Sequence, residues 1–197
     1  MSRRLRPLLV AVVAVLALAG CQTNPGTAAY VGKQQITAAQ LDRVIAVDTP
    51  AARSQVRQNA LNVLVLTALL RGIADDLGVA VSPAAIAASL EDPQIRQQAA
   101  ELGVTAEAVG AFDTYRTMTV RGVAAQVTGG SQSITPAQQA QVQQRLTELS
   151  AAAAKHIRVN PRYGTFDLEQ GLVLPTVEPF VKQLSTPPGA EQPAAGG

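Results

Sequence analysis

Apolar residues recur at three- and four-residue steps over most of the chain, the spacing of one face of an α-helix. The longest such stretch runs from Ala51 to Leu77 and ends at Gly78. One stripe of it comprises Val56, Ala60, Val63, Thr67, Leu70, Ala74 and Leu77. The other sides of the same helix carry Leu61, Leu64, Val65, Leu66 and Leu69. A helix that is apolar all round is either enclosed by other elements or offers a second face to a partner.

Helix-start signals divide the rest of the central region into further helices. Thr37 followed by Gln40 has the spacing of a capping box and predicts a helix over residues 38–47. Three other sites place a capping side chain before a proline at the first helical position: Ser82-Pro83, Asp92-Pro93 and Thr135-Pro136. Together with a further start at Thr105, these signals predict helices from Ser82, over 94–102, over 105–127 and from Thr135 to about Ala154.

Short segments at both ends of the helical region have strand character. Ala29–Ile36 is predicted to be a strand broken by a Gly-Lys turn, and residues 157–159 alternate apolar and polar side chains. A turn over 160–164 then precedes a second strand at 165–167. Strands this short are marginal alone, so we expect this pair to join the strand at Ala29–Ile36. The predicted fold is mainly α, a multi-helix domain with a small β-sheet that pairs the N-terminal and C-terminal strands.

The two ends of the chain differ from this region. Three arginines precede an apolar run from Leu8 to Ala19, which is shorter than the roughly 20 residues of a membrane-spanning helix and is typical of a secretory signal peptide. Residues 185–197 are rich in Pro, Gly and Ala without periodicity. The predicted organisation is a signal peptide over 1–20, a tether over 21–28, one helical domain over 29–184 and a disordered tail over 185–197.

The single cysteine, Cys21, directly follows the apolar run. The residues Leu18-Ala19-Gly20-Cys21 match the lipobox of bacterial lipoproteins. This resemblance implies that a diacylglyceryl group is attached to Cys21, that the chain is cleaved before it, and that the protein is held on the extracytoplasmic face of the cell membrane. Two acyl chains anchor a protein stably where one does so only marginally. The alternative is a conventional signal peptide followed by an idle cysteine.

Removal of residues 1–20 changes the charge balance of the chain. Three of the 16 Lys and Arg residues lie there, so the remainder has 13 basic and 14 acidic residues and a net charge of −1. No run of basic residues remains in the sequence, and we therefore expect no nucleic-acid partner.

The sequence offers little for catalysis or metal binding. One histidine and one cysteine do not supply the common zinc ligand sets. A Ser-His-Asp triad would rest on His156, whose predicted place beside Lys155 at a helix C-terminus favours a structural role instead. Gly129-Gly130 lacks the lysine and the flanking strand of a phosphate-binding loop. We expect no enzymatic activity, no metal and no cofactor.

The first half of the predicted domain resembles a known family. The segment AAYVGKQQIT is followed by AQLDRVI and by a long helix that ends in ALLRGIADDLGVAVSP. This order is similar to the N-terminal domain of SurA-like and PrsA-like extracytoplasmic chaperones, over about Ala29 to Glu101. The matching positions are Val31, Gly32, Ile36, Thr37, Leu41, Asp42, Leu69, Ala74, Leu77, Gly78, Val79, Val81 and Ser82. Residues 159–167 look like the closing strand of small actinobacterial-type lipoproteins that carry this domain.

The resemblance implies a domain that binds unfolded or partly folded exported polypeptides. A parvulin-type prolyl isomerase module often accompanies such a domain, but its pattern is missing from this sequence. Binding of unfolded chains needs exposed, adaptable apolar side chains, and Leu61, Val65 and Leu69 of the long helix are the candidate client-binding residues. The alternative is that neighbouring helices cover these three side chains.

Two classes of function follow from these expectations. The first is a membrane-anchored chaperone or holdase without an isomerase module, which binds unfolded exported polypeptides. The second is a structural or scaffold lipoprotein that binds one dedicated envelope partner. A protein related to peptidyl-prolyl isomerases ranks third.

Overall fold

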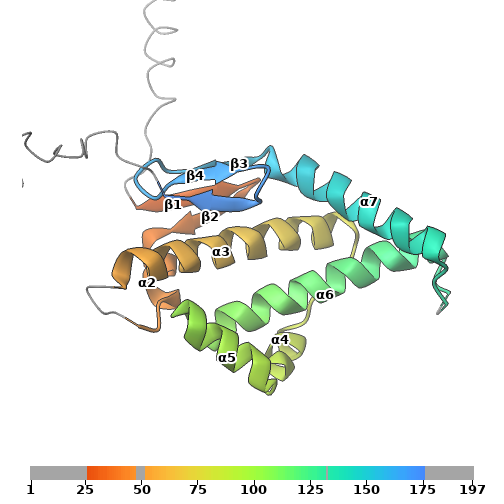
Figure 1. Cartoon of the computed structure of the whole chain (residues 1–197), viewed down its shortest axis with the longest axis horizontal. Helices are drawn as coiled ribbons and strands as arrows, with labels where there is room; N and C mark the ends of the chain where they lie inside the picture. Colours follow the sequence, from red (N-terminus) through yellow and green to blue (C-terminus); the bar gives the residue numbers. More distant parts are fainter. Residues whose placement is uncertain (1–25, 48–51, 132, 176–197) are drawn as a thin grey trace, which may run out of the picture.

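The computed structural model describes residues 26–47, 52–131 and 133–175 (Figure 1). The predicted signal peptide, the proposed lipid attachment site Cys21 and the predicted tail lie outside the described residues. The described part is mainly helical with a small amount of antiparallel β-sheet, as the sequence predicts. Its helices are α2 (Ala38–Val44), α3 (Arg53–Asp76), α4 (Pro83–Ser89), α5 (Pro93–Leu102), α6 (Ala106–Thr128) and α7 (Pro136–Ala154).

Side-chain caps confirm four of the predicted helix starts, at Thr37, Ser82, Asp92 and Thr135, whereas Thr105 precedes α6 without a capping hydrogen bond from its side chain. At α2, the Thr37 side chain accepts a hydrogen bond from the Gln40 backbone N–H at 3.1 Å, and the Gln40 side chain accepts one from the Thr37 N–H at 2.8 Å. Thr135 and Gln138 form the same reciprocal pair at the start of α7. Such a cap satisfies backbone donors that a helix leaves without internal partners, which is why these short sequence signals fix the helix starts.

A three-stranded antiparallel sheet brings the two ends of the domain together. It contains β1 (Thr27–Val31), β2 (Gln34–Thr37) and β3 (Ile157–Val159), in the order β2-β1-β3. The predicted pairing of N-terminal and C-terminal strands is therefore confirmed, and β1 begins two residues earlier than expected. Alternation along β1 buries Ala29 and Val31 against the helices and leaves Tyr30 on the outer face.

The predicted place of residues 165–167 in this sheet is wrong. These residues form β4 (Thr165–Asp167), which pairs with β5 (Leu172–Leu174), a strand that the sequence pattern does not predict. The two make a separate antiparallel hairpin. Gly164 adopts φ +137°, and a side chain there would collide with the Leu174 carbonyl oxygen. A glycine at this position therefore lets the chain leave β3 and run closely against β5.

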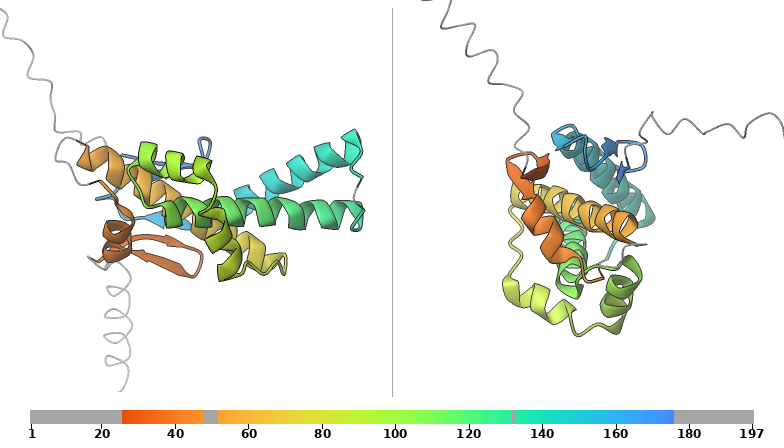
Figure 2. Two further views of the ribbon diagram at one scale, coloured as in Figure 1. Left: turned by 90° about the horizontal axis from the view of Figure 1, so that it is seen from below. Right: turned by 90° about the vertical axis from the view of Figure 1, so that its left-hand side faces the viewer.

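Helix α3 lies at the centre of the domain. The sheets and α7 lie on one side of α3, and α6 lies on the other, with α4 and α5 beyond it (Figure 1). An end-on view shows the other elements arranged around α3 (Figure 2). The core cluster includes Leu61, Val65 and Ile73 of α3 together with Ala29 of β1 and Val173 of β5. A helix enclosed in this way needs apolar residues on most of its circumference, which explains its unusual composition.

Candidate functional site

The structure places the three candidate client-binding residues in the core. The exposed fractions of Leu61, Val65 and Leu69 are 1%, 0% and 7%. The expectation that they form an exposed apolar face is wrong, and the alternative that neighbouring elements cover them is confirmed. The reason is that α3 packs against α6 on one side and against β1, β2 and β5 on the other, and these elements enclose the three side chains.

An apolar groove lies beside this buried stripe. It has a volume of about 470 Å³ and is bounded by α3, α6, α7 and the β4–β5 hairpin. Its lining is formed by Leu66, Leu69, Leu70, Phe112, Arg116, Leu146, Thr147, Ser150, Ala151, Ala154, Phe166, Leu168 and Gly171. Leu69 is the one predicted site residue that reaches this groove, since neither Leu61 nor Val65 lines it. The other α3 residues of the lining, Leu66 and Leu70, were not among the predicted client-binding residues.

Small side chains on α7 explain why the groove stays open. The last five residues of this helix read Ser150-Ala151-Ala152-Ala153-Ala154. Alanine favours the helix, but its side chain is too short to fill the space above Leu66 and Leu70 of α3. Ala151 is exposed in consequence, whereas Ala153 packs against the core cluster. The side chains of the leucine-rich helix α3 and the alanine-rich end of α7 therefore do not fill the space between the two helices.

The β4–β5 hairpin forms one wall of the groove. Its turn is fixed by Asp167, whose Oδ1 accepts hydrogen bonds from the backbone N–H groups of Glu169 at 2.8 Å and Gln170 at 2.9 Å. This is the geometry by which an aspartate stabilises a turn with its own side chain. Leu168, between the aspartate and these donors, is held outward with 63% of its surface exposed. A large apolar side chain is therefore presented at the rim of an apolar groove.

The hairpin is attached to α3 by side-chain amides. The Val173 backbone N–H donates to Asn62 Oδ1 at 2.6 Å, and the Val173 carbonyl oxygen accepts from Gln58 Nε2. Asn62 Nδ2 lies 3.4 Å from the same carbonyl oxygen. Two polar residues of an otherwise apolar helix thus satisfy the backbone of β5, so the position of the groove wall depends on them.

Two polar residues of the groove lining, Arg116 and Thr147, are exposed. Arg116 is exposed and forms an ion pair with Asp113 of the same helix at 2.7 Å. Thr147, on α7, donates to the Gln143 carbonyl oxygen of its own helix at 3.0 Å. These groups are satisfied within their own helices, so the interior of the groove presents mainly apolar surface to an occupant.

The groups considered for catalysis are not gathered into a site. His156 is exposed next to Lys155, just after the end of α7, and its backbone carbonyl oxygen accepts a hydrogen bond from the Gly32 N–H at 3.0 Å. Gly129 and Gly130 form the turn at the end of α6, both with positive φ. Within residues 26–47, 52–131 and 133–175, no three side chains of the His, Cys, Asp and Glu types gather to hold a metal. No helix in the same ranges has both the length and the apolar character needed to span a bilayer.

Comparison of the chain with protein-family models, curated proteins and solved structures found no match. The SurA-like assignment therefore stays a prediction from the residues quoted for it.

Proposed function

We propose that the protein is an extracytoplasmic lipoprotein, anchored through Cys21, that binds apolar segments of unfolded or partly folded exported polypeptides. The observation that carries this proposal is the open apolar groove with Leu168 exposed at its rim. The binding surface is assigned to this groove in place of Leu61 and Val65, which belong to the core.

The chemistry of the groove supports a client rich in apolar side chains. Its volume of about 470 Å³ falls within the range of roughly 300–1,000 Å³ that is usual for binding pockets. Leucine, phenylalanine and alanine supply most of the lining, and these offer contact area without a fixed pattern of hydrogen-bond donors and acceptors. Such a groove binds apolar segments of many different sequences, as a holdase must.

The binding test uses the chain from residue 21 onward with Cys21→Ser. An unrelated exported protein is diluted from denaturant in its presence, and light scattering follows aggregation. We expect suppression by the unaltered domain, and weaker suppression by a Leu168→Ser variant. Because Leu168 contributes apolar area at the rim, the concentration for half-maximal suppression should rise about 5- to 10-fold.

Leu172→Ser is the matched control for this test. Leu172 lies on the same hairpin and is 38% exposed, but it does not line the groove. The Leu172→Ser variant should suppress aggregation as well as the unaltered chain does. Failure of the unaltered domain to suppress aggregation at any ratio contradicts the holdase proposal. Copurification of one folded envelope protein in a defined ratio would then favour the scaffold function.

The anchor has a separate test. The full chain is produced in a bacterial host, and the N-terminal peptide of the membrane-bound protein is analysed by mass spectrometry. We expect a peptide that begins at Cys21 and carries acyl chains. Cys21→Ser should move the protein to the soluble fraction, whereas an unmodified cysteine in a membrane-bound chain would contradict the proposal.

A further inference from the structure

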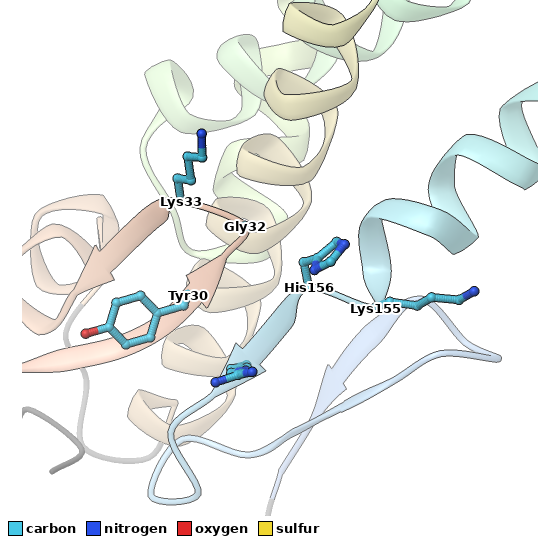
Figure 3. A pocket seen from close by; sticks show the side chains of 6 residues that line it. Tyr30, Gly32, Lys33, Lys155 and His156 are labelled. Atoms are coloured by element: carbon cyan, nitrogen blue, oxygen red, sulfur yellow. The ribbon is translucent and has the colours of Figure 1, made fainter. Parts of the chain in front are cut away.

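Basic side chains from distant parts of the sequence meet at one end of the three-stranded sheet. Pairing of β1 with β3 sets Tyr30 opposite Arg158, and the adjoining turns bring Lys33 and Lys155 to the same end. With Gly32 and His156, these residues line a cavity of about 610 Å³ (Figure 3). No carboxylate belongs to this lining. We call Tyr30, Lys33, Lys155 and Arg158 the basic face.

No ion pair among the described residues neutralises the cations of the basic face. The ion pairs there join Arg57 to Asp42, Arg116 to Asp113 and Arg145 to Glu148, none of which is a residue of this face. Lys33, Lys155 and Arg158 are all exposed and form no ion pair within the described ranges. Since the chain from Cys21 onward has a net charge of −1, this face is a local concentration of positive charge on a nearly neutral protein.

The arrangement of these side chains fits an extended anionic surface better than one small anion. Lys33 lies on the turn between β1 and β2, whereas Lys155 and His156 lie on the neighbouring turn between α7 and β3 (Figure 3). The Lys33 and Lys155 side chains point in different directions and do not converge on one point (Figure 3). Tyr30 adds a 40% exposed ring with a polar hydroxyl, a side chain that is favoured at membrane–water interfaces.

One residue of the basic face, Tyr30, lies in β1, the strand that follows the proposed anchor in sequence. Five peptide units separate Cys21 from Gly26, which limits their separation to about 18 Å. Tyr30 follows four residues after Gly26, a further distance of about 13 Å. A lipid on Cys21 would therefore keep the basic face close to the bilayer surface. The basic face and the apolar groove share no residue, so contact at one does not use up the other.

We infer that the basic face rests on the anionic phospholipid headgroups of the membrane that carries the anchor. This inference rests on the proposed lipidation of Cys21, and it assigns a fixed orientation to the domain. Phosphate groups complement Lys33, Lys155 and Arg158, while the Tyr30 ring lies at the level of the headgroups. The outer face of the β2-β1-β3 sheet then faces the bilayer, and the client groove remains free.

The experiment uses the lipidated full chain, purified from bacterial membranes and reconstituted into vesicles. The sequence contains no tryptophan, so Tyr30→Trp introduces a single tryptophan, on the basic face, whose emission can be excited apart from that of the remaining tyrosines. Brominated phospholipids quench tryptophan that touches the bilayer. We expect quenching in vesicles that contain phosphatidylglycerol, and its loss in vesicles of phosphatidylcholine alone or in high salt, because the attraction is electrostatic. Ile134→Trp, in the segment between α6 and α7, should not be quenched in either vesicle.

A charge variant supplies the second measurement. Lys33→Gln, Lys155→Gln and Arg158→Gln are combined in the Tyr30→Trp chain. Each basic residue near an anionic surface favours contact about five-fold, so the equilibrium constant for docking should fall on the order of 100-fold. The matched control combines Arg96→Gln, Arg121→Gln and Arg145→Gln, which changes the net charge equally on other exposed surfaces and should leave quenching unchanged.

The outcomes separate this inference from the proposed anchor. Two results would overturn the basic-face inference and leave the anchor intact, provided that the chain floats with the vesicles. In one, the Tyr30→Trp chain shows no quenching. In the other, its quenching does not depend on lipid charge or on the Lys33, Lys155 and Arg158 substitutions. A chain that does not float with vesicles of either composition overturns the anchor and, with it, the inference.

Discussion

Asn62 of α3 pairs with the backbone of Val173 in β5 through both atoms of its side-chain amide. Its Oδ1 accepts from the Val173 N–H at 2.6 Å, and its Nδ2 lies 3.4 Å from the Val173 carbonyl oxygen. These residues are 111 positions apart. The Asn62 side chain thus supplies hydrogen bonds that the backbone of a neighbouring strand would otherwise supply. It holds in place the hairpin that carries Phe166 and Leu168 of the groove.

We predict that Asn62→Ala lowers the free energy of unfolding by about 1–3 kcal/mol, because it leaves the Val173 N–H without its acceptor. The carbonyl oxygen keeps Gln58 as a donor, so the loss falls on one backbone group. Urea unfolding followed by circular dichroism measures the change. Gln55→Ala is the control on the same helix, since Gln55 is exposed and, within the described residues, its side chain bonds only to Asn59, at 3.0 Å. Equal stability of the two variants would show that the amide pairing does not hold the hairpin.

Leu61→Ala tests the assignment of the predicted client-binding residues to the core. With only 1% of its surface exposed, Leu61 leaves a cavity on truncation, and the free energy of unfolding should fall by about 2–5 kcal/mol. Thermal and urea unfolding measure this loss. Leu168→Ala, at a side chain that is 63% exposed, should change the stability by less than about 0.5 kcal/mol. If the Leu61→Ala variant were stable and bound clients more weakly, the client-binding surface would have to be assigned to this face of α3.

Local signals predicted the helices well, because each depends on a few adjacent residues. The capping box of Thr37 and Gln40 and the Asp92-Pro93 start both form as expected, with Asp92 Oδ1 accepting from the Gln94 N–H at 2.8 Å. The pairing of β1 with β3 was also predicted, because strand segments this short are marginal unless they join another strand.

The candidate site was harder to predict, because burial depends on contacts between distant segments. Periodicity shows that Leu61 and Val65 are apolar on a second side of α3, but it does not say what lies against that side. β5, which covers part of it, is only three residues long and carries no strand alternation that stands out in the sequence. The alanine run in α7 was a usable signal: small residues in a helix that faces a leucine-rich helix leave space between the two.

The turn at Gly103 provides a prediction about the packing of α5 on α3. Gly103 caps α5 with φ +70°, and a Cβ built there would lie 2.7 Å from Cγ2 of Val56. Gly103→Ala should therefore combine the strain of a left-handed residue with a steric clash, and lower the free energy of unfolding by about 2–4 kcal/mol. Gly78→Ala, at φ +69° in open space, should show the strain alone, about 1–2 kcal/mol. Urea unfolding compares the two.

A double variant isolates the clash at Gly103. Val56→Ala removes the methyl groups that a new Cβ would meet, so Gly103→Ala should cost less stability in the Val56→Ala background than in the unaltered chain. The same cost in both backgrounds would mean that Val56 and Gly103 are not in contact.

The proposed groove can be filled without disturbing the core. Ala151 of α7 is exposed and lines the groove, whereas Ala152, next to it, is exposed but does not line it. Ala151→Leu should occupy part of the 470 Å³ space and weaken the suppression of aggregation about 5- to 10-fold, because the added side chain takes the place of the client. Leucine and alanine both favour helices, so both Ala151→Leu and Ala152→Leu should unfold within about 1 kcal/mol of the unaltered chain.

Light scattering with the same denatured client compares the two alanine variants. We expect Ala152→Leu to act like the unaltered domain, because it adds the same apolar surface to α7 outside the groove. This comparison is sharper than removal of an apolar residue, since a loss of binding on adding apolar surface cannot come from a weaker hydrophobic effect. Equal suppression by both variants would mean that clients bind elsewhere on the domain, and stronger suppression by both would mean that any exposed apolar side chain on α7 serves.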